Sequence, residues 1–246
     1  MVHNGTIVER PGVSITGDGV VGGGIIGKLR INGEGVIHGD TDCHLLRCNG
    51  SAVINGSLLG RQARVNGHVK VSHHVQMEHV RVNGSLDAGG SVRISRIGIN
   101  GGLSTGADLF AVKGVVNGTL DVGGNLEAEE MTVRGILRVS GSVIARELTL
   151  RLVTQASRVN ELRSRTVFVA PTLLAKWFRS SRIGYLNAEL IEGEDITLEN
   201  TRAAIVRGRK VHIGKGCSIG RVEYTETFSA DAQAEIGSYY KIDARH

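Results

Sequence analysis

Two glycine-rich stretches near the N-terminus have the spacing of nucleotide-binding loops. The run Gly17-Asp18-Gly19-Val20-Val21-Gly22 matches G-x-G-x-x-G, and Gly22 to Lys28 matches the first seven positions of a phosphate-binding P-loop. The first pattern should open a helix, but Gly23 and Gly24 follow it and no helical pattern does. The second needs Ser or Thr after the lysine to hold magnesium, and Leu29 stands there. We therefore expect no nucleotide and no other cofactor.

Side chains suited to acid–base catalysis or metal binding are present in an unfavourable arrangement. Four histidines are close in sequence: His68, His73, His74 and His79. Because His73 and His74 are adjacent, they point to opposite faces of any strand, which disfavours a shared metal. Asp87, Asp121 and Glu127 are scattered, with Asp87 and Asp121 two repeats apart and Glu127 at another position of the repeat described below, so they suggest no acid–base pair. We expect no catalytic residue, no metal site and no small-molecule substrate.

The cysteines indicate the compartment. Cys43, Cys48 and Cys217 are odd in number and lack the paired spacing of a metal site, so we expect buried thiols in a reducing cytosol. No stretch approaches the roughly 18 apolar residues of a membrane span, and no secretory signal pattern is evident at the N-terminus. These features predict a cytoplasmic protein.

Four arginines recur at one spacing and form what we call the basic stripe: Arg30, Arg47, Arg64 and Arg81. They predict a line of positive charge on one edge of the fold, which could meet phospholipid headgroups or an acidic partner, or remain a solvated edge. The net charge of +5 and the pI of about 9.3 are mild. A slight basic excess is more typical of a solvated surface than of nucleic-acid binding, so no nucleic acid is expected.

The element that positions these residues is a 17-residue repeat. A triplet of an apolar residue, Asn and Gly returns every 17 positions, with Arg replacing Asn in the last copy: Ile31-Asn32-Gly33, Cys48-Asn49-Gly50, Val65-Asn66-Gly67, Val82-Asn83-Gly84, Ile99-Asn100-Gly101, Val116-Asn117-Gly118 and Val133-Arg134-Gly135. A register held over more than a hundred residues is the signature of a repeat architecture.

Apolar columns appear when the copies are aligned. Four places after each triplet begins stand Gly35, Ala52, Val69, Leu86, Leu103, Leu120 and Leu137. Between the columns, apolar and polar residues alternate in short runs, which is strand periodicity. The glycines mark corners with positive φ or close backbone approach, and Asn also tolerates the left-handed region. Three short strands and three corners per repeat predict an all-β fold, a parallel β-helix (β-solenoid) with triangular coils.

The repeat divides the chain into four parts. Residues 1–13 are predicted as a polar arm, 14–152 as the regular β-helix, 153–185 as an irregular basic and aromatic insertion, and 186–246 as further coils that end in a terminal strand or cap at 239–242. Part of the insertion has the composition of an amphipathic element that docks on a membrane or partner, or folds back over the solenoid. Its residues are Leu173, Leu174, Lys176, Trp177, Phe178 and Arg179.

These features together resemble the bactofilins, a family of polymer-forming bacterial cytoskeletal proteins. The resemblance rests on the serial triplets and on a tail that runs through Ile191-Glu192-Gly193, Val206-Arg207-Gly208 and Cys217-Ser218-Ile219-Gly220. It is similar to the longer members from Gram-positive bacteria. The resemblance implies a right-handed β-helix that assembles end to end without nucleotide. It also implies a cytoplasmic scaffold, often beside the membrane, for envelope, cell-shape or motility machinery.

A solenoid also favours assembly on physical grounds, because its end coils carry unpaired backbone groups. We expect the polymer contacts to involve Ile15, Val20, Val222, Tyr224 and Phe228, although Ile15 and Val222 suit core packing equally well. Two alternatives stay open. One is an acyltransferase of the hexapeptide-repeat type, whose period of 18 and catalytic histidine this chain does not match. The other is an adaptor that does not polymerise.

Overall fold

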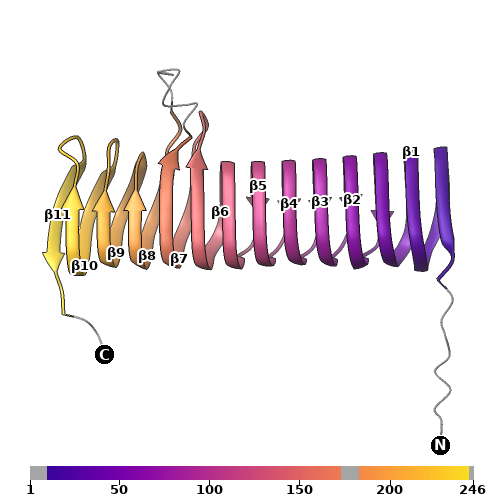
Figure 1. Cartoon of the computed structure of the whole chain (residues 1–246), viewed down its shortest axis with the longest axis horizontal. Coiled ribbons are helices and arrows are strands. Elements are labelled where there is room, and N and C mark those ends of the chain that lie inside the picture. The colour runs from indigo at the N-terminus through magenta and orange to yellow at the C-terminus, as the bar shows by residue number, and fades with distance from the viewer. Residues whose placement is uncertain (1–9, 173–182, 244–246) are drawn as a thin grey trace, which may run out of the picture.

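A computed structural model describes residues 10–172 and 183–243 as a single stack of parallel strands. The strands are β1 (Gly12–Asn55), β2 (Leu58–Val71), β3 (Val75–Ala88), β4 (Val92–Thr105), β5 (Leu109–Val122), β6 (Leu126–Leu152), β7 (Ser157–Pro171), β8 (Leu186–Leu198), β9 (Thr201–Ile213), β10 (Ser218–Ala230) and β11 (Glu235–Lys241). The described residues contain no helix. The chain is therefore an all-β parallel solenoid, as the repeat predicts (Figure 1).

Each strand pairs in parallel with the next along the chain, so sheet order equals sequence order. From β1 to β6 the register advances by one repeat per coil: Val65 of β2 pairs with Val82 of β3, which pairs with Ile99 of β4. Neighbouring coils are about 4.8 Å apart, as in any sheet. The molecule is consequently an elongated rod with its two chain ends at opposite ends (Figure 1).

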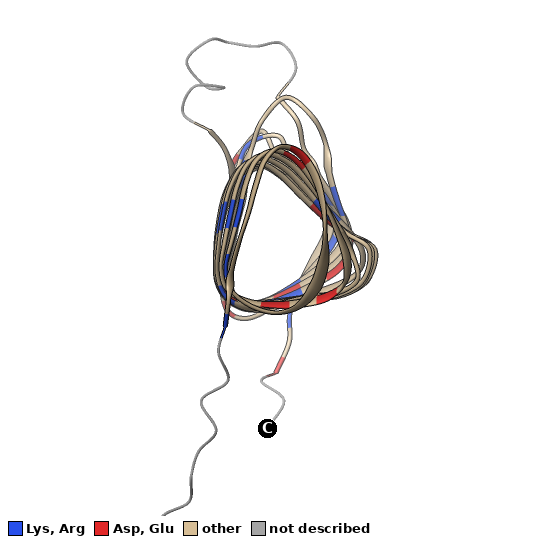
Figure 2. Cartoon of the chain, turned by 90° about the vertical axis from the view of Figure 1, so that its right-hand side faces the viewer, with Lys and Arg blue, Asp and Glu red and all other residues tan. Residues whose placement is uncertain are grey.

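The core is a continuous column of small aliphatic side chains inside a three-sided outline (Figure 2). Leu103, Leu120 and Leu137, which occupy one predicted column, are 0–1% exposed. Each inner residue packs against its equivalents in the coils above and below, so like residues form ladders. Burial of these columns stabilises the coils because a single coil has no second layer to cover its apolar face.

The corner after each triplet depends on glycine, and the sequence interpretation of the asparagine was wrong. The triplet glycines have positive φ, for example +130° at Gly84 and +131° at Gly101. The asparagines do not, since Asn200 is the sole described non-glycine residue with positive φ. They instead form a ladder in which each amide Nδ2 donates to the Oδ1 of the preceding coil, over 2.8–3.0 Å from Asn32 to Asn117.

The predicted insertion is smaller than its predicted range. Residues 157–171 form β7, which pairs with β6 on one side and β8 on the other. The prediction of irregular structure was wrong there because the register changes while the strand geometry continues: Arg138 pairs with Arg158, and Ser142 with Glu161. Residues 173–182, with all six predicted docking residues, lie outside the described part of the chain.

Candidate functional site

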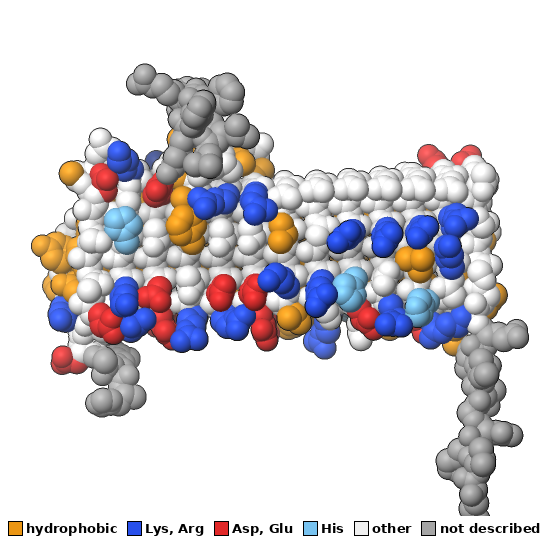
Figure 3. All heavy atoms as spheres, viewed as in Figure 1, with side chains coloured by type: hydrophobic (Ala, Val, Ile, Leu, Met, Phe, Trp, Pro, Cys, Tyr) orange, Lys and Arg blue, Asp and Glu red, His pale blue; other side chains and the backbone are white. Residues whose placement is uncertain are grey.

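The basic stripe lies on one flat side of the solenoid, in its N-terminal half (Figures 2 and 3). Parallel pairing places Arg47 beside Arg64 and Arg64 beside Arg81, and Arg30 stands one repeat earlier in β1. The next register position is Gly98, so the stripe ends there. Arg30, Arg64 and Arg81 are exposed, and Arg47 is partly buried. Four positive side chains therefore follow one line along the long axis.

The arginines of the stripe have no ion pair with any described residue, although opposite charges are paired in other outward columns. Arg61 pairs with Glu78 one coil away at 3.3 Å, and Arg138 pairs with Asp121 at 3.0 Å. The Nε of Arg47 is buried and has no hydrogen-bond partner. Two like charges about 5 Å apart repel by roughly 1 kcal/mol in water, so stacking these arginines does not stabilise the fold electrostatically.

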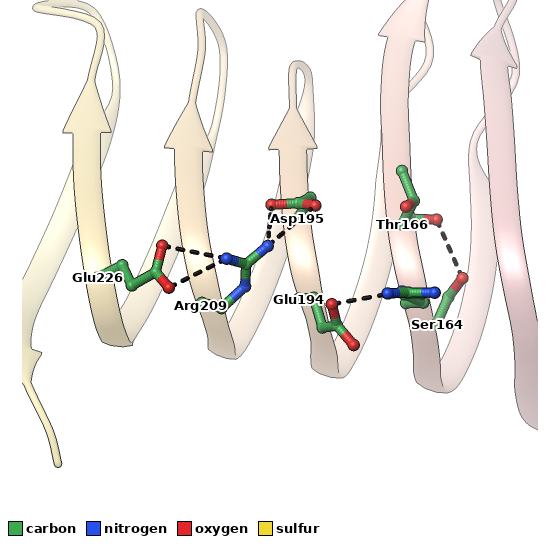
Figure 4. A network of polar contacts seen from close by, with 7 residues as sticks. Ser164, Thr166, Glu194, Asp195, Arg209 and Glu226 are labelled. Carbon is green, nitrogen blue, oxygen red and sulfur yellow. Dashed lines mark hydrogen bonds and ion pairs between the residues drawn. The ribbon is translucent and has the colours of Figure 1, made fainter. Parts of the chain in front are cut away.

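The C-terminal coils show the opposite arrangement. Arg209 of β9 lies between two acids, with Asp195 of β8 at 3.3 Å and Glu226 of β10 at 3.0 Å (Figure 4). Arg207 similarly contacts Glu192 at 3.7 Å and Glu223 at 2.6 Å. Glu223 holds the pKa of the Arg207 guanidinium above its ordinary value, chiefly through this hydrogen bond. Arg207 and Arg209 are therefore paired with acids within the molecule.

Neutral columns border the stripe. On one side lies the asparagine ladder, with Asn49, Asn66 and Asn83 each two residues after a stripe arginine. On the other side Leu45, Gln62 and His79 stack in register. The positive charge is consequently one residue wide over these coils.

The C-terminal end of the rod carries an aromatic cluster. The Tyr224 and Phe228 rings stack at 5.4 Å between centroids, and Phe228 contacts Tyr239 of β11 at 5.1 Å. Tyr239 pairs with Val222, whose side chain is fully buried, so Tyr239 occupies an inner column, yet it is 61% exposed. Among the predicted contact residues, Tyr224 and Phe228 thus lie in this cluster, whereas Val222 lies one strand inward, in the core.

The N-terminal end also exposes apolar side chains. Val20 is 66% exposed and Ile25 is 48% exposed, both in the first part of β1. Ile15, the other predicted contact, is only 5% exposed and belongs to the core. The glycine-rich nucleotide-like patterns lie in this same extended part of β1.

Residues that the sequence analysis missed are Ile25, Tyr239 and Tyr240, the last being 55% exposed. A signal for Tyr239 was available, because it stands 17 residues after Val222 and so continues an inner column past the last triplet. The predicted cap at 239–242 includes the end of β11, whose outer edge has no partner strand among the described residues.

The histidines join separate polar contacts. The Nδ1 atom of His68 is within hydrogen-bond distance of the Ser85 hydroxyl, at 2.5 Å, and His74 Nδ1 is 2.9 Å from that of Ser91. His68 also lies 3.5 Å from the Asp87 carboxylate. No three His, Cys, Asp or Glu side chains converge as metal ligands within residues 10–172 and 183–243.

The three cysteines are buried and free of disulfides. Burial raises the pKa of the Cys43 thiol to about 12 and those of Cys48 and Cys217 to about 11. The thiols are therefore protonated at neutral pH, and a protonated thiol is a poor nucleophile and metal ligand.

Comparison with known proteins finds relatives without a described function. The chain is 42% identical to uncharacterized protein YhbF of Bacillus subtilis over 86 residues, which cover 35% of each chain. It is 47% identical to uncharacterized protein YhbE of the same organism over 57 residues, 23% of this chain and 24% of YhbE. The matches thus span about a third and a quarter of these relatives. Neither a family model nor a solved structure gives a significant match.

Within the described ranges, no helix has the length and apolar character needed to cross a bilayer.

Proposed function

We propose that this chain is a non-enzymatic scaffold subunit whose copies join end to end into filaments without nucleotide. The observation that carries the proposal is the pair of uncovered ends. Within residues 10–172 and 183–243, both ends combine open strand edges with exposed apolar side chains, whereas the sides of the rod carry mostly polar columns with single exposed apolar residues such as Val112 and Ile144. The resemblance of the triplets and tail to bactofilins supports the same function.

At the C-terminal end, β11 pairs only with β10, and residues 227–230 of β10 pair only with β9, among the described residues. Their outer backbone groups are available to another strand. Tyr239 would be covered in a longer stack, because it occupies the column of Val222 and Val206, both fully buried. A further coil placed on this end would bury it.

At the N-terminal end, Val20 and Ile25 offer apolar surface beside the outer edge of β1. Unpaired edges promote strand addition, and natural proteins usually block them with charges, proline or a covering element. Joining two ends would extend the same sheet and the same core across subunits, which offsets the loss of translational freedom on assembly.

Substitution of one apolar residue at each end tests the proposal. The variants Val20→Asp and Tyr239→Asp place a charge where a neighbouring coil would have to cover it. We expect the wild-type chain to form filaments one solenoid wide in negative-stain electron microscopy, without nucleotide. Each variant should lower the pelleted fraction in ultracentrifugation at least tenfold at equal concentration.

Val112→Asp is the matched control, since Val112 is 52% exposed but lies on the side of the rod in β5. It should leave filaments intact. Discrete monomers or small oligomers of the wild type across salt and concentration would contradict the proposal. Equal loss of filaments in all three variants would contradict the assignment of the ends.

The proposal includes a cytoplasmic location, peripheral to the inner face of the membrane, and a role in organising envelope, cell-shape or motility machinery. The segment at 173–179 remains the proposed docking element for membrane or partner. Fractionation of cells that carry the tagged chain tests the location. Recovery of the chain outside the cytoplasm and the cytoplasmic membrane fraction would contradict it.

A further inference from the structure

The basic stripe lacks the ion pairs that several other charged columns of the solenoid form. In a stack of coils, an outward residue always has equivalents directly above and below it. The charged columns at Arg61, Lys113 and Arg138 place an acid in the next or preceding coil. The stripe instead places arginine on arginine for four coils and gives none of them an acid among the described residues. A line of like charge without internal partners raises the local positive potential and attracts negatively charged ligands.

The shape of the stripe limits what it can bind. From Arg47 to Arg81 its charges form a single file flanked by neutral columns, Asn49 to Asn83 on one side and Leu45 to His79 on the other. Beside Arg30, the position equivalent to Leu45 is Lys28, which adds one charge at the N-terminal end of the file. A bilayer would be met best by a two-dimensional basic or amphipathic face. Three strand spacings of about 4.8 Å give the file a length of roughly 14 Å. A one-dimensional ligand parallel to the rod matches this geometry.

The chemistry of the side chains indicates phosphate. Arginine presents several N–H donors in a planar fork that fits phosphate oxygens in pairs. The buried Nε of Arg47 has no acceptor, and an anion that draws this guanidinium outward would supply one. The neighbouring ladder uses one N–H of each asparagine amide, and an amide carries two.

We propose that the basic stripe binds a linear polyanion with phosphate groups along its chain, aligned with the solenoid axis. The ligand is a polymer without bases, because neither the four stripe positions nor their flanking columns carry a Phe, Tyr or Trp ring on which successive bases would stack, and a single imidazole, that of His79, stands beside the stripe. The stripe lies within one chain, so binding does not need end-to-end assembly. The failure of either proposal therefore leaves the other standing.

The test uses fluorescently labelled polyphosphate of uniform length and the purified full chain, with fluorescence anisotropy over a sodium chloride series. The double variant Arg64→Gln/Arg81→Gln removes two exposed stripe charges. We expect at least tenfold weaker binding than wild type. The slope of log affinity against log salt should fall by roughly 1.4, since each lost phosphate contact on a single strand contributes about 0.7.

Arg61→Gln/Arg165→Gln is the matched control, because it removes the same net charge from exposed arginines that already pair with Glu78 and Glu194. It should bind within threefold of wild type. Equal losses in both double variants, or no binding by wild type, would overturn the proposal. Two further results would also overturn it: binding to anionic lipid vesicles that polyphosphate does not displace, and tenfold tighter binding to single-stranded DNA with the same number of phosphates.

Discussion

Among single residues, the triplet glycines control how closely the coils approach. A Cβ added to Gly84 would lie 2.0 Å from the carbonyl oxygen of Gly67, and Gly84 also has φ of +130°. Gly101 meets the oxygen of Gly84 in the same way. These glycines are therefore required twice, by backbone conformation and by contact with the preceding coil.

Gly84→Ala should destabilise the fold by about 2–4 kcal/mol, because it combines a strained φ with a backbone clash that no side-chain rotation relieves. The measurement is the free energy of unfolding from urea titration followed by circular dichroism. Gly102→Ala is the control: the nearest atom to its added Cβ is the Cβ of Ser85 at 3.9 Å, and its φ is not positive. Similar losses in both variants would contradict the role of the corner.

At the scale of elements, β7 joins two kinds of coil. On its β6 side the register steps are 20 and then 19 residues, since Arg138 pairs with Arg158 and Ser142 with Glu161. On its far side β7 pairs with β8 at a step of 29, since Ser157 pairs with Leu186, and from β8 to β9 the step is 15, since Leu186 pairs with Thr201. Strand β7 therefore keeps the core continuous while the coil length changes.

Val167→Asp in β7 should destabilise the coils on the C-terminal side of β7 more than those at the N-terminal end of the rod. Val167 is 1% exposed and stacks between Leu148 of β6 and Ile196 of β8, so an ionised side chain there has no partner and costs several kcal/mol. Because each coil contacts only its neighbours, hydrogen exchange with mass spectrometry should show lost protection in β8 to β11 and retained protection in β2 to β4.

Ile144→Asp is its control, because it introduces the same charge at a residue of β6 that is 49% exposed. It should leave the exchange pattern unchanged. Uniform loss of protection along the whole rod in Val167→Asp would contradict the division into halves.

The sequence predicted the coils well where the period holds and poorly where it changes. The columns through Leu103 and Leu120 follow from periodicity alone, because like residues must stack. Strand β7 was not predicted because it departs from the step of 17, whereas parallel pairing needs only alternating inner residues such as Val159 and Val167. The asparagine ladder was missed because backbone propensity was considered without the partner in the next coil. The absence of acids beside the stripe arginines could be recognised only from the strand pairing, which shows which residues lie next to them.

Over the whole molecule, one core encloses all three thiols. Their pKa values are raised from 9.0 to about 12 for Cys43 and about 11 for Cys48 and Cys217. Between pH 9 and 11 the folded chain therefore holds protons that the unfolded chain has released. Since stability falls with pH wherever the native state binds more protons, the thiols stabilise the fold fully below pH 9 and progressively less above it.

The free energy of unfolding should consequently decline from pH 9 to 11, by at most about 1.4 kcal/mol per pH unit for each thiol. Urea titration at each pH measures it. A variant with all three cysteines replaced by alanine should show a shallower decline, because lysine and tyrosine titrate equally in both proteins. Parallel slopes would mean that the thiols do not ionise on unfolding in this range.

The asparagine ladder also determines which insertions and deletions this part of the chain can accept. Each inner amide of the ladder contacts the equivalent amides 17 residues before and after it, so the register tolerates change only in whole coils. Duplication of one 17-residue segment between Asn49 and Asn100 would lengthen the rod by one strand spacing. Each residue would still pack against equivalent residues in the adjacent coils. Loss or gain of a single residue there would misalign all inner columns beyond it. Rods built this way can therefore evolve new lengths only in steps of one whole coil.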